Sequence, residues 1–282
     1  HTRHRETPIP PHQRPTPHGA VRHTAGARRI GRSISLSLAS SGFHVVIQTR
    51  SVDDGINLVA DEIRSLGSTC TIVEGNLESL DSPQKLFSDS IESLPHDTIL
   101  VGLVNCASMF HWDAPSNVKS ESLISHYKVN SVAPILLSSL LYNYLKEIDI
   151  SSFEQKMSPC IVNILDQKLV APHPDHFSYT LSKQALSGAT IMMAKEFAPF
   201  CRVNAVLPGH VLASPDQTSK GFEKAQSESP LGYGPSPSDI AEAVVFLIRA
   251  KSVTAQSLVV DAGEHLLGRS RDVVFETEGL DD

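Results

Sequence analysis

The chain has 282 residues, of which 40% are hydrophobic, and its formal net charge is −7 at pH 7. This length supplies enough chain for one large domain or two small ones, and we favour one. Beyond the first segment the basic residues are scattered, which excludes an extended nucleic-acid surface. The longest apolar stretch, at 133–141, is far shorter than the ~20 residues that span a membrane. We therefore expect a soluble protein with neither a nucleic-acid nor a membrane partner.

The first 23 residues differ in composition from the rest. They contain five histidines, five prolines and four arginines but only one acid, Glu6. Because such a composition cannot bury a core, we predict a disordered leader or tag over residues 1–19. A metal-binding segment and a transit peptide are the alternatives, but the histidine spacing is irregular and the prolines oppose an amphipathic helix.

The four cysteines lie far apart beside strand-like apolar residues, at positions Cys70, Cys106, Cys160 and Cys201. None forms a CxxC pair. They indicate reduced core cysteines in a cytoplasmic protein, with disulfides or zinc as the alternative.

Extended and helical patterns alternate along the rest of the chain. Runs rich in β-branched residues predict strands at 43–47, 70–73, 99–104, 160–165, 203–207 and 258–260. Helices are predicted at 29–41, 55–66, 83–94, 118–146, 177–198 and 238–249. Near-continuous apolar strands alternating with helices are typical of a parallel sheet covered on both faces. The expected fold is α/β, a doubly wound, Rossmann-like three-layer sandwich in a single domain at 20–268, followed by a C-terminal tail at 269–282.

A glycine-containing turn precedes the first predicted helix and reads Thr24-Ala25-Gly26-Ala27-Arg28-Arg29-Ile30-Gly31. Glycines here let the backbone turn tightly and approach a pyrophosphate, whose charge the amino end of a helix favours. An ordinary glycine turn is the alternative. The strand expected before this turn, at 20–23, is unusually polar for a central strand because it contains Arg22 and His23.

The residues after the second predicted strand indicate which dinucleotide would bind. An acid at this point accepts the ribose hydroxyls of NADH, whereas a basic residue accommodates the 2′-phosphate of NADPH. Arg50 and Ser51, with Arg29 nearby, therefore favour NADPH. The alternative is that Arg50 is only a solvated residue after a strand.

Tyr179 and Lys183 are four residues apart on a predicted helix, which places both side chains on one face. A cation beside a phenol stabilises the phenolate, so we expect Lys183 to lower the pKa of Tyr179 and to make it a proton donor near neutral pH. Asp166 follows the strand at 160–165, at the end of a parallel sheet where ligands gather. Its alternative role is to cap the loop that follows.

These motifs together resemble the short-chain dehydrogenase/reductase family. Thr24 to Gly31 resembles its TGxxxGxG turn, and Asn105 begins a segment similar to NNAG. The remaining matches are Asn130, the Tyr179 and Lys183 pair, Pro208-Gly209 and Val260-Asp261-Ala262-Gly263. The resemblance implies that Asn130 supports a water path to Lys183. It implies cofactor contacts at Gly26, Arg28, Arg29, Ile30, Gly31, Arg50, Ser51, Asn76, Leu77, Asn105, Ala107, Ser108, Tyr179, Lys183, Pro208 and Gly209.

Asp166 departs from most members of that family, which have a serine there to bond a substrate carbonyl. An ionised aspartate would repel the developing alkoxide, which disfavours simple ketone reduction. The aspartate resembles instead the pteridine reductases and dihydromonapterin reductases. That resemblance implies that Phe110 stacks on the pterin and that Arg29 and Ser108 lie near the cofactor and the substrate. Other departures are Ala25 for glycine, Asn76 for an aspartate, Cys106 for an asparagine and Ala262 for glycine.

The long connector at 210–236 is rich in Ser, Gly and Pro and suggests a mobile lid, with plain disorder as the alternative. Leu212 and Tyr233 are its candidate substrate contacts. His173 and His176 lie in a proline-rich loop without a convincing third ligand, so we predict no metal site.

We thus expect NADPH-dependent reduction of a dihydropterin or dihydrofolate, with Asp166, Tyr179, Lys183 and Asn130 as the catalytic residues. The alternatives are a short-chain carbonyl or 3-oxoacyl reductase and a non-catalytic NADP-binding redox sensor. The family resemblance also implies a homotetramer built through the helices at 118–146 and 177–198.

Overall fold

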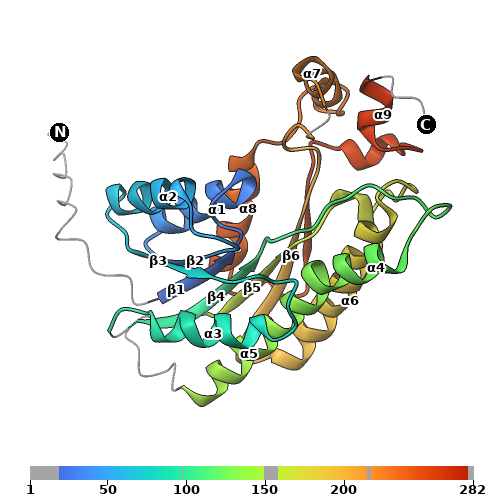
Figure 1. The fold of residues 1–282 in the computed structure, drawn as a ribbon. Helices are drawn as coiled ribbons and strands as arrows, with labels where there is room; N and C mark the ends of the chain where they lie inside the picture. The colour runs from blue at the N-terminus through green and yellow to red at the C-terminus, as the bar shows by residue number, and fades with distance from the viewer. Residues whose placement is uncertain (1–18, 97, 149–157, 215–216, 279–282) are drawn as a thin grey trace, which may run out of the picture.

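A seven-stranded, all-parallel sheet forms the centre of the protein (Figure 1). The computed structural model describes residues 19–96, 98–148, 158–214 and 217–278, so the predicted leader lies outside them except for Gly19. The strands are β1 (Gly19–Thr24), β2 (His44–Thr49), β3 (Cys70–Glu74), β4 (Ile99–Asn105), β5 (Cys160–Ile164), β6 (Arg202–Pro208) and β7 (Ser257–Val260). Their order, β3-β2-β1-β4-β5-β6-β7, confirms the predicted Rossmann-like sheet.

Helices cover both faces of this sheet, which confirms the predicted three-layer sandwich. They are α1 (Arg29–Ser40), α2 (Asp54–Ser65), α3 (Ser82–Glu92), α4 (Ser120–Tyr127), α5 (Ala133–Glu147), α6 (Phe177–Phe197), α7 (Ser219–Ser227), α8 (Pro237–Arg249) and α9 (Val273–Glu278). A π-helical turn (Lys128–Val132) joins α4 to α5. Helices α1, α2 and α8 lie on one face, and α3, α5 and α6 lie on the other (Figure 1).

Alternate strand residues supply two separate cores, which is why the strands are apolar almost throughout. The core under α1, α2 and α8 includes Val21, Ile47, Val162, Ile34 and Val244. The core under α3, α5 and α6 includes Ala20, Val46, Leu103, Leu137 and Phe197. A residue facing either way from a central parallel strand meets a helix, so both positions favour apolar side chains.

The polar strand β1 lies at the centre of the sheet despite its sequence, between β2 and β4. Arg22 and His23 are both fully buried. The Arg22 Nε donates to Ser90 Oγ at 2.9 Å, while its two terminal nitrogens have no hydrogen-bond partner among the described residues. His23 Nδ1 lies 2.9 Å from Ser35 Oγ. Burial lowers the pKa of Arg22 to about 10 and that of His23 to about 3.

Two helices, α7 and α9, fall where the sequence predicts a loop and a tail. Helix α7 lies inside the predicted loop at 210–236, and Thr218 caps it by accepting a hydrogen bond from the Gly221 backbone at 3.0 Å. Arg269 pairs with Glu228 at the end of α7 and with Glu276 of α9. The two helices therefore form one unit beside the sheet (Figure 1).

Burial of His23 makes the protein sensitive to acid. The pKa of His23 is about 3 in the folded protein and 6.5 ordinarily. Between pH 6.5 and pH 3, therefore, His23 binds a proton in the unfolded chain but not in the folded one. This contribution to stability is complete above pH 6.5 and is lost as the pH falls towards 3, at ~1.4 kcal/mol per pH unit. Urea denaturation between pH 7.5 and 4.5 should show a shallower loss for His23→Val than for wild type. If both proteins lost the same free energy of unfolding per pH unit, the acid sensitivity could not be assigned to His23.

The incompletely paired guanidinium of Arg22 should cost stability. Replacing it by an apolar side chain of similar length, Arg22→Met, should raise the free energy of unfolding by ~1–3 kcal/mol, because no buried charge is left to desolvate. Arg22→Lys keeps the charge and serves as the control, with no gain expected. A loss of stability in Arg22→Met, measured by urea denaturation, would show that the guanidinium is a net stabiliser.

Candidate active site

Asp166, Tyr179 and Lys183 meet at the carboxyl end of β5, as the sequence predicts. The Tyr179 hydroxyl donates to Asp166 Oδ2 at 2.7 Å. Lys183 Nζ donates to the Ile164 carbonyl at 2.7 Å and lies 5.7 Å from the centroid of the Tyr179 ring. The end of β5 and the first two turns of α6 thus place a carboxylate, a phenol and an ammonium group in one cluster.

The first turn of α6 is fixed by Asp113, from the loop that follows β4. Asp113 Oδ1 accepts a hydrogen bond from the Ser178 backbone at 2.9 Å, and its Oδ2 accepts one from the Ser178 hydroxyl. The Asp113 carbonyl accepts a further bond from the Phe177 backbone at 3.1 Å. Asp113 is buried, and these bonds join the loop after β4 to the helix that carries Tyr179. In the sequence, nothing distinguishes the Asp113 carboxylate from that of a solvated loop residue, so this contact could not be predicted.

Burial controls the protonation of this cluster. It raises the pKa of Asp166, and it raises the pKa of Tyr179 well above its usual value, with a further increase from the neighbouring Asp166 carboxylate. Burial also lowers the pKa of Lys183 to about 8. The expected lowering of the Tyr179 pKa is therefore wrong, because burial disfavours the phenolate. In addition, the Asp166 carboxylate faces the phenol, whereas the ammonium bonds the Ile164 carbonyl.

Asp166 also makes the cap that the sequence suggests as its alternative role. While Oδ2 accepts the Tyr179 hydroxyl, Oδ1 accepts the Lys168 backbone N–H at 2.8 Å and caps a 3₁₀ turn (Gln167–Leu169). The cap fixes the carboxylate, so that the second oxygen is held towards the phenol.

Asn130 lies in the π-helical turn and holds the loop after β4. Its Oδ1 accepts the Met109 backbone N–H at 2.7 Å, and its Nδ2 donates to the Met109 carbonyl at 2.9 Å and to Ser182 Oγ at 3.0 Å. It therefore connects α4 and α5 to α6 and to the loop that carries Phe110. The water path from Asn130 to Lys183 stays a prediction.

The predicted phosphate-binding turn joins β1 to α1. Thr24 Oγ1 accepts the backbone N–H groups of Cys106 and Ala107, both at 2.9 Å, and so ties the ends of β1 and β4 together. A Cβ at Gly31 would lie 2.0 Å from the Ala25 carbonyl oxygen, which requires glycine at that position. Ala25 itself adopts φ +56°, a conformation that glycine adopts more readily.

Gln48, which the sequence analysis did not single out, connects this turn to the end of β3. Its Oε1 accepts the Ala25 backbone N–H at 3.3 Å, and its Nε2 donates to the Gly75 carbonyl at 2.7 Å. Asn76, which follows Gly75, is exposed, and its Oδ1 accepts a hydrogen bond from the Glu78 backbone N–H at 3.1 Å. Leu77 is buried. One buried amide thus sets the spacing of two loops predicted to bind the cofactor.

Basic residues gather at the end of β2. Arg50 and Ser51 are exposed, and Arg28 forms an ion pair with Asp53, the residue that caps α2. The pairing holds Arg28 beside the segment that follows Arg50. Exposed cations therefore lie at the position where the sequence predicts a 2′-phosphate.

The NNAG-like segment divides between the core and the surface. The Asn105 side chain is buried and donates to Asn163 Oδ1 at 2.8 Å. Only the backbone of Asn105 is therefore available to contact a cofactor. Ser108, at the other end of the segment, is exposed. Ile30, a predicted cofactor contact in the first turn of α1, is half-buried against the core under that helix.

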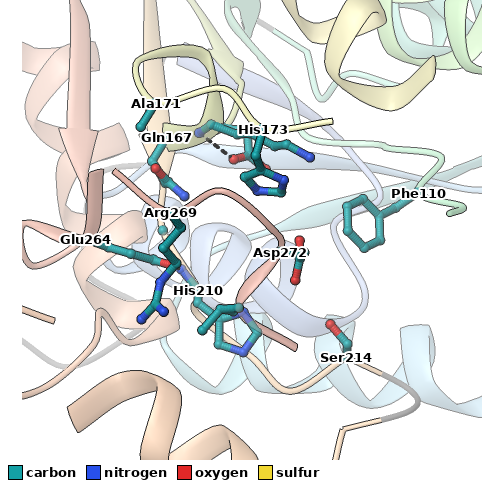
Figure 2. A pocket seen from close by; sticks show the side chains of 13 residues that line it. Phe110, Gln167, Ala171, His173, His210, Ser214, Glu264, Arg269 and Asp272 are labelled. Carbon is teal, nitrogen blue, oxygen red and sulfur yellow. Dashed lines mark hydrogen bonds between the residues drawn. The ribbon is translucent and has the colours of Figure 1, made fainter. Parts of the chain in front are cut away.

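A pocket of about 620 Å³, counted with its opening to solvent, lies beside the Asp166 cluster (Figure 2). It is lined by Phe110, Asp166, Gln167, Lys168, Ala171, His173, Gly209, His210, Ser214, Glu264, Arg269, Asp272 and Val273. Phe110 stacks on His176 with ring centroids 4.0 Å apart and meets the Tyr179 ring edge-on at 4.8 Å.

The structure brings only some of the predicted substrate contacts to this pocket. Phe110 and Asp166 line it, and Tyr179 reaches it through its bond to Asp166. Arg29, Ser108, Leu212 and Tyr233 are not among the described residues that line it. Arg29 donates to the Ala213 carbonyl at 3.3 Å, and Tyr233 is 62% exposed.

A second wall of the pocket comes from residues to which the sequence analysis gave no role. Glu264 follows β7, and its Oε2 accepts the His210 backbone N–H at 2.9 Å; burial raises its pKa to about 7. Burial also disfavours the charged form of His173 and lowers its pKa to about 4. Among the described residues, no group of three or more His, Cys, Asp or Glu side chains is arranged to hold a metal ion.

The C-terminal segment is attached to this wall by an ion pair between the buried Asp175 and the half-buried Arg271. Arg271 Nε donates to Asp175 Oδ2 at 2.9 Å, and the Asp272 backbone donates to the same oxygen at 2.8 Å. Asp272 Oδ2 also lies 3.7 Å from His176 Nε2. Arg269, Asp272 and Val273 of the predicted C-terminal tail therefore line the pocket.

Comparison with known proteins fits this arrangement. Residues 24–265 match the family model described as enoyl-(acyl carrier protein) reductase. Dihydromonapterin reductase of Citrobacter koseri is 25% identical over 243 residues, covering 86% of this chain and 95% of that protein. The 3-oxoacyl-[acyl-carrier-protein] reductase FabG of Staphylococcus epidermidis is 24% identical over 250 residues, covering 86% and 97%.

Among solved structures, the FolM alternative dihydrofolate reductase 1 of Brucella canis, complexed with NADP, aligns with a TM-score of 0.79 at 31% identity. The alignment covers 91% of this chain and 98% of that one. The parallel sheet, the Tyr179 and Lys183 pair and a family match over most of the chain lead to one conclusion: this protein is an enzyme of the short-chain dehydrogenase/reductase family of NAD(P)-dependent oxidoreductases.

Proposed function

We propose that this enzyme reduces a pteridine, of the dihydropterin or dihydrofolate type, with NADPH. The observation that carries the proposal is the 2.7 Å hydrogen bond from the Tyr179 hydroxyl to Asp166, beside the ring of Phe110. A flat heteroaromatic substrate would stack on Phe110 and present a ring nitrogen to the phenol. The similarity to dihydromonapterin reductase and to the FolM protein supports the same substrate class.

The side chains fit the proton transfer that such a reduction needs. Bound NADPH supplies the hydride to a substrate carbon, and a proton must reach the adjacent nitrogen. The Tyr179 phenol is protonated near neutral pH and is the group placed to give up that proton, and its raised pKa makes it a weaker acid than a phenol in water. The Asp166 carboxylate, whose pKa is also raised, then takes up a proton from solvent water and passes it to the Tyr179 phenolate, which restores the phenol. Lys183 holds a positive charge next to the phenol, where it orients the cofactor ribose.

The chemistry of the loops at the ends of β1 and β2 supports NADPH as the cofactor. The turn from Thr24 to Gly31 leads into the amino end of α1, which favours a pyrophosphate. Arg50, Ser51 and the Asp53-anchored Arg28 offer cations and a hydroxyl for a 2′-phosphate.

Reduction of a 3-oxoacyl thioester is the second candidate, since the FabG protein covers the chain about as fully as the pterin enzyme does. Asp166 argues against it. A carboxylate bonded to the catalytic phenol would stand beside the oxygen on which the negative charge develops, and this destabilises the transition state.

We also propose that the enzyme is a cytoplasmic homotetramer. Apolar side chains are exposed on the two long helical segments that we expect at the interface: Ile124, Tyr127 and Leu136 on α4 to α5, and Ile191 and Met192 on α6. Such surfaces favour association between subunits. None of the four cysteines forms a disulfide, which fits a reducing compartment. No described helix combines the length and the hydropathy that a bilayer crossing requires.

Substitutions at Asp166 and Tyr179 test the proposed chemistry. NADPH oxidation is followed with dihydropterin, dihydrofolate and a 3-oxoacyl thioester. Tyr179→Phe should lower kcat on the pterin by ~10²–10⁴-fold, because the proton donor is lost. Asp166→Ser should lose pterin activity and gain ketone activity. Wild-type turnover of the thioester together with inertness towards every pteridine would refute the pteridine assignment.

Arg50 tests the choice of cofactor. Arg50→Ala should raise the KM for NADPH by about tenfold, the effect of losing one charged hydrogen bond, and leave the KM for NADH unchanged. Arg64→Ala is the matched control, since Arg64 is exposed at the far end of α2, where it pairs with Asp61. Equal effects on both cofactors would place Arg50 outside the phosphate site.

A further inference from the structure

The predicted phosphate-binding turn, Thr24 to Gly31, holds two non-glycine residues in a left-handed conformation. Ala25 has φ +56° and Arg29 has φ +52°. Both stand where the TGxxxGxG pattern has glycine. A residue with a Cβ adopts this conformation at a cost that glycine does not have, because the Cβ crowds the neighbouring carbonyl. The turn therefore needs contacts from the rest of the fold to keep its shape.

A buried pair, His23 and Ser35, supplies one of these contacts. The Ser35 hydroxyl donates to the Gly26 carbonyl at 3.0 Å, and His23 Nδ1 lies 2.9 Å from Ser35 Oγ. A hydroxyl has one proton to donate, so Ser35 accepts from His23, and His23 carries its proton on Nδ1. Both side chains are fully buried. Two consecutive hydrogen bonds thus tie the turn to the core, and the first of them begins in β1.

The pair leaves one polar atom of the core unsatisfied. His23 Nε2 is buried and has no hydrogen-bond partner among the described residues. With the proton on Nδ1, this nitrogen can only accept, and a buried acceptor without a partner costs free energy. An apolar side chain in a central parallel strand would avoid that cost. Core packing alone therefore does not explain an imidazole at this position, whereas its bond to Ser35 does.

The bond to Gly26 fixes the direction of the peptide group that follows it. In a planar trans peptide the carbonyl and the N–H point in opposite directions. Because the Gly26 carbonyl is directed at Ser35 in the core, the Ala27 N–H of the same peptide group is directed away from Ser35. Backbone N–H groups at the amino end of a helix are the groups that a pyrophosphate contacts.

The backbone of the turn lies directly against the pair. A Cβ on Gly26 would be 2.6 Å from Ser35 Oγ and 3.0 Å from His23 Nδ1, which is closer than side-chain atoms pack. On the other side of the turn, Gln48 holds the Ala25 N–H. A change at Ser35 is therefore transmitted to the turn without an intervening residue.

We propose that His23 and Ser35 are positioning residues for the dinucleotide cofactor, which hold the Gly26 to Ala27 peptide group in the orientation that binds the pyrophosphate and so compensate for the missing glycine at position 25. Both are buried beneath the turn and act through it. Without the pair, the strained turn relaxes, the fraction of molecules ready to bind falls, and the affinity falls with that fraction. This inference rests on the dinucleotide of the family and is independent of the pteridine assignment.

The test measures the dissociation constants of NADPH and NADH by fluorescence titration of the complete chain. Ser35→Ala should raise both by about tenfold, as expected for one or two hydrogen bonds, because both cofactors carry the pyrophosphate. Ser40→Ala, at the exposed end of α1, is the matched control and should keep the wild-type constants. His23→Val should raise both constants by a smaller factor, because Ser35 keeps its bond to Gly26 but loses the group that orients it.

Adenosine 2′-phosphate distinguishes positioning of the turn from general disruption of the fold. This fragment has no pyrophosphate, so Ser35→Ala should bind it as the wild type does, in a competition titration against NADPH. An equal loss of affinity for the fragment and for NADPH would show that the substitution disturbs the whole site, and it would overturn the inference.

Ala25→Gly tests the compensation directly. Glycine adopts the left-handed conformation without crowding, so the turn depends less on Ser35 in this background. Adding Ser35→Ala to Ala25→Gly should raise the dissociation constant of NADPH by no more than about twofold, since the two substitutions act on the same turn and are not additive. A tenfold rise in both backgrounds would overturn the inference.

The outcomes also separate this inference from the proposed function. If the wild type binds NADPH or NADH, and Ser35→Ala or His23→Val binds them equally well, the positioning role is overturned and the proposed function stands. If the wild type binds neither cofactor, the cofactor assignment fails and the positioning role fails with it.

Discussion

The hydrogen bond between the Tyr179 hydroxyl and the Asp166 carboxylate is the contact on which the rest of the site depends. Burial raises the pKa of both groups, so each holds a proton more tightly than it would in water. A pair of this kind is useful only if its geometry is fixed, because a phenol and a carboxylate that separate would each be solvated independently. Asp113 fixes the start of α6 and the Lys168 backbone fixes the carboxylate. The polar contacts around the pair thus serve to keep two proton-binding groups together.

Most of the sheet could be predicted from the sequence. Each strand that packs helices on both sides is apolar at consecutive positions, and this pattern marks six of the seven strands, with ends within about two residues of those observed. Strand β1 is the exception, because Arg22 and His23 are polar but fully buried. Helices α7 and α9 were missed for a related reason: their stability comes from contacts such as Arg269 with Glu228 and Glu276, which join distant segments. The hydrophobic pattern of a segment does not show which distant residues the segment contacts, so it could not predict these two helices.

The site was predictable only where a residue belongs to an ordered motif. Asp166, Tyr179 and Lys183 are recognisable by their spacing and their place after a strand. Gln48, Asp113 and Glu264 are ordinary residues in sequence, and only the fold brings them to the loops and pockets they hold. The direction of the Tyr179 pKa could not be obtained from the Tyr179 and Lys183 spacing, since it depends on burial and on which neighbour the hydroxyl faces. Sequence motifs identify the candidate reacting groups, and the tertiary structure sets their proton affinities.

The ion pair between Asp175 and Arg271 joins residues 96 positions apart in the chain. Strands β6 and β7 and helices α6 to α8 all lie between them. During synthesis the sheet, with its cofactor-side loops, can therefore assemble before the second wall of the pocket exists, because closing so long a loop is slow. A nascent or truncated chain that ends before Arg271 would contain every strand and the Asp166 to Lys183 cluster, but its pocket would lack one side. If the pocket binds substrate as we propose, substrate recognition is the last property that this fold acquires as it forms.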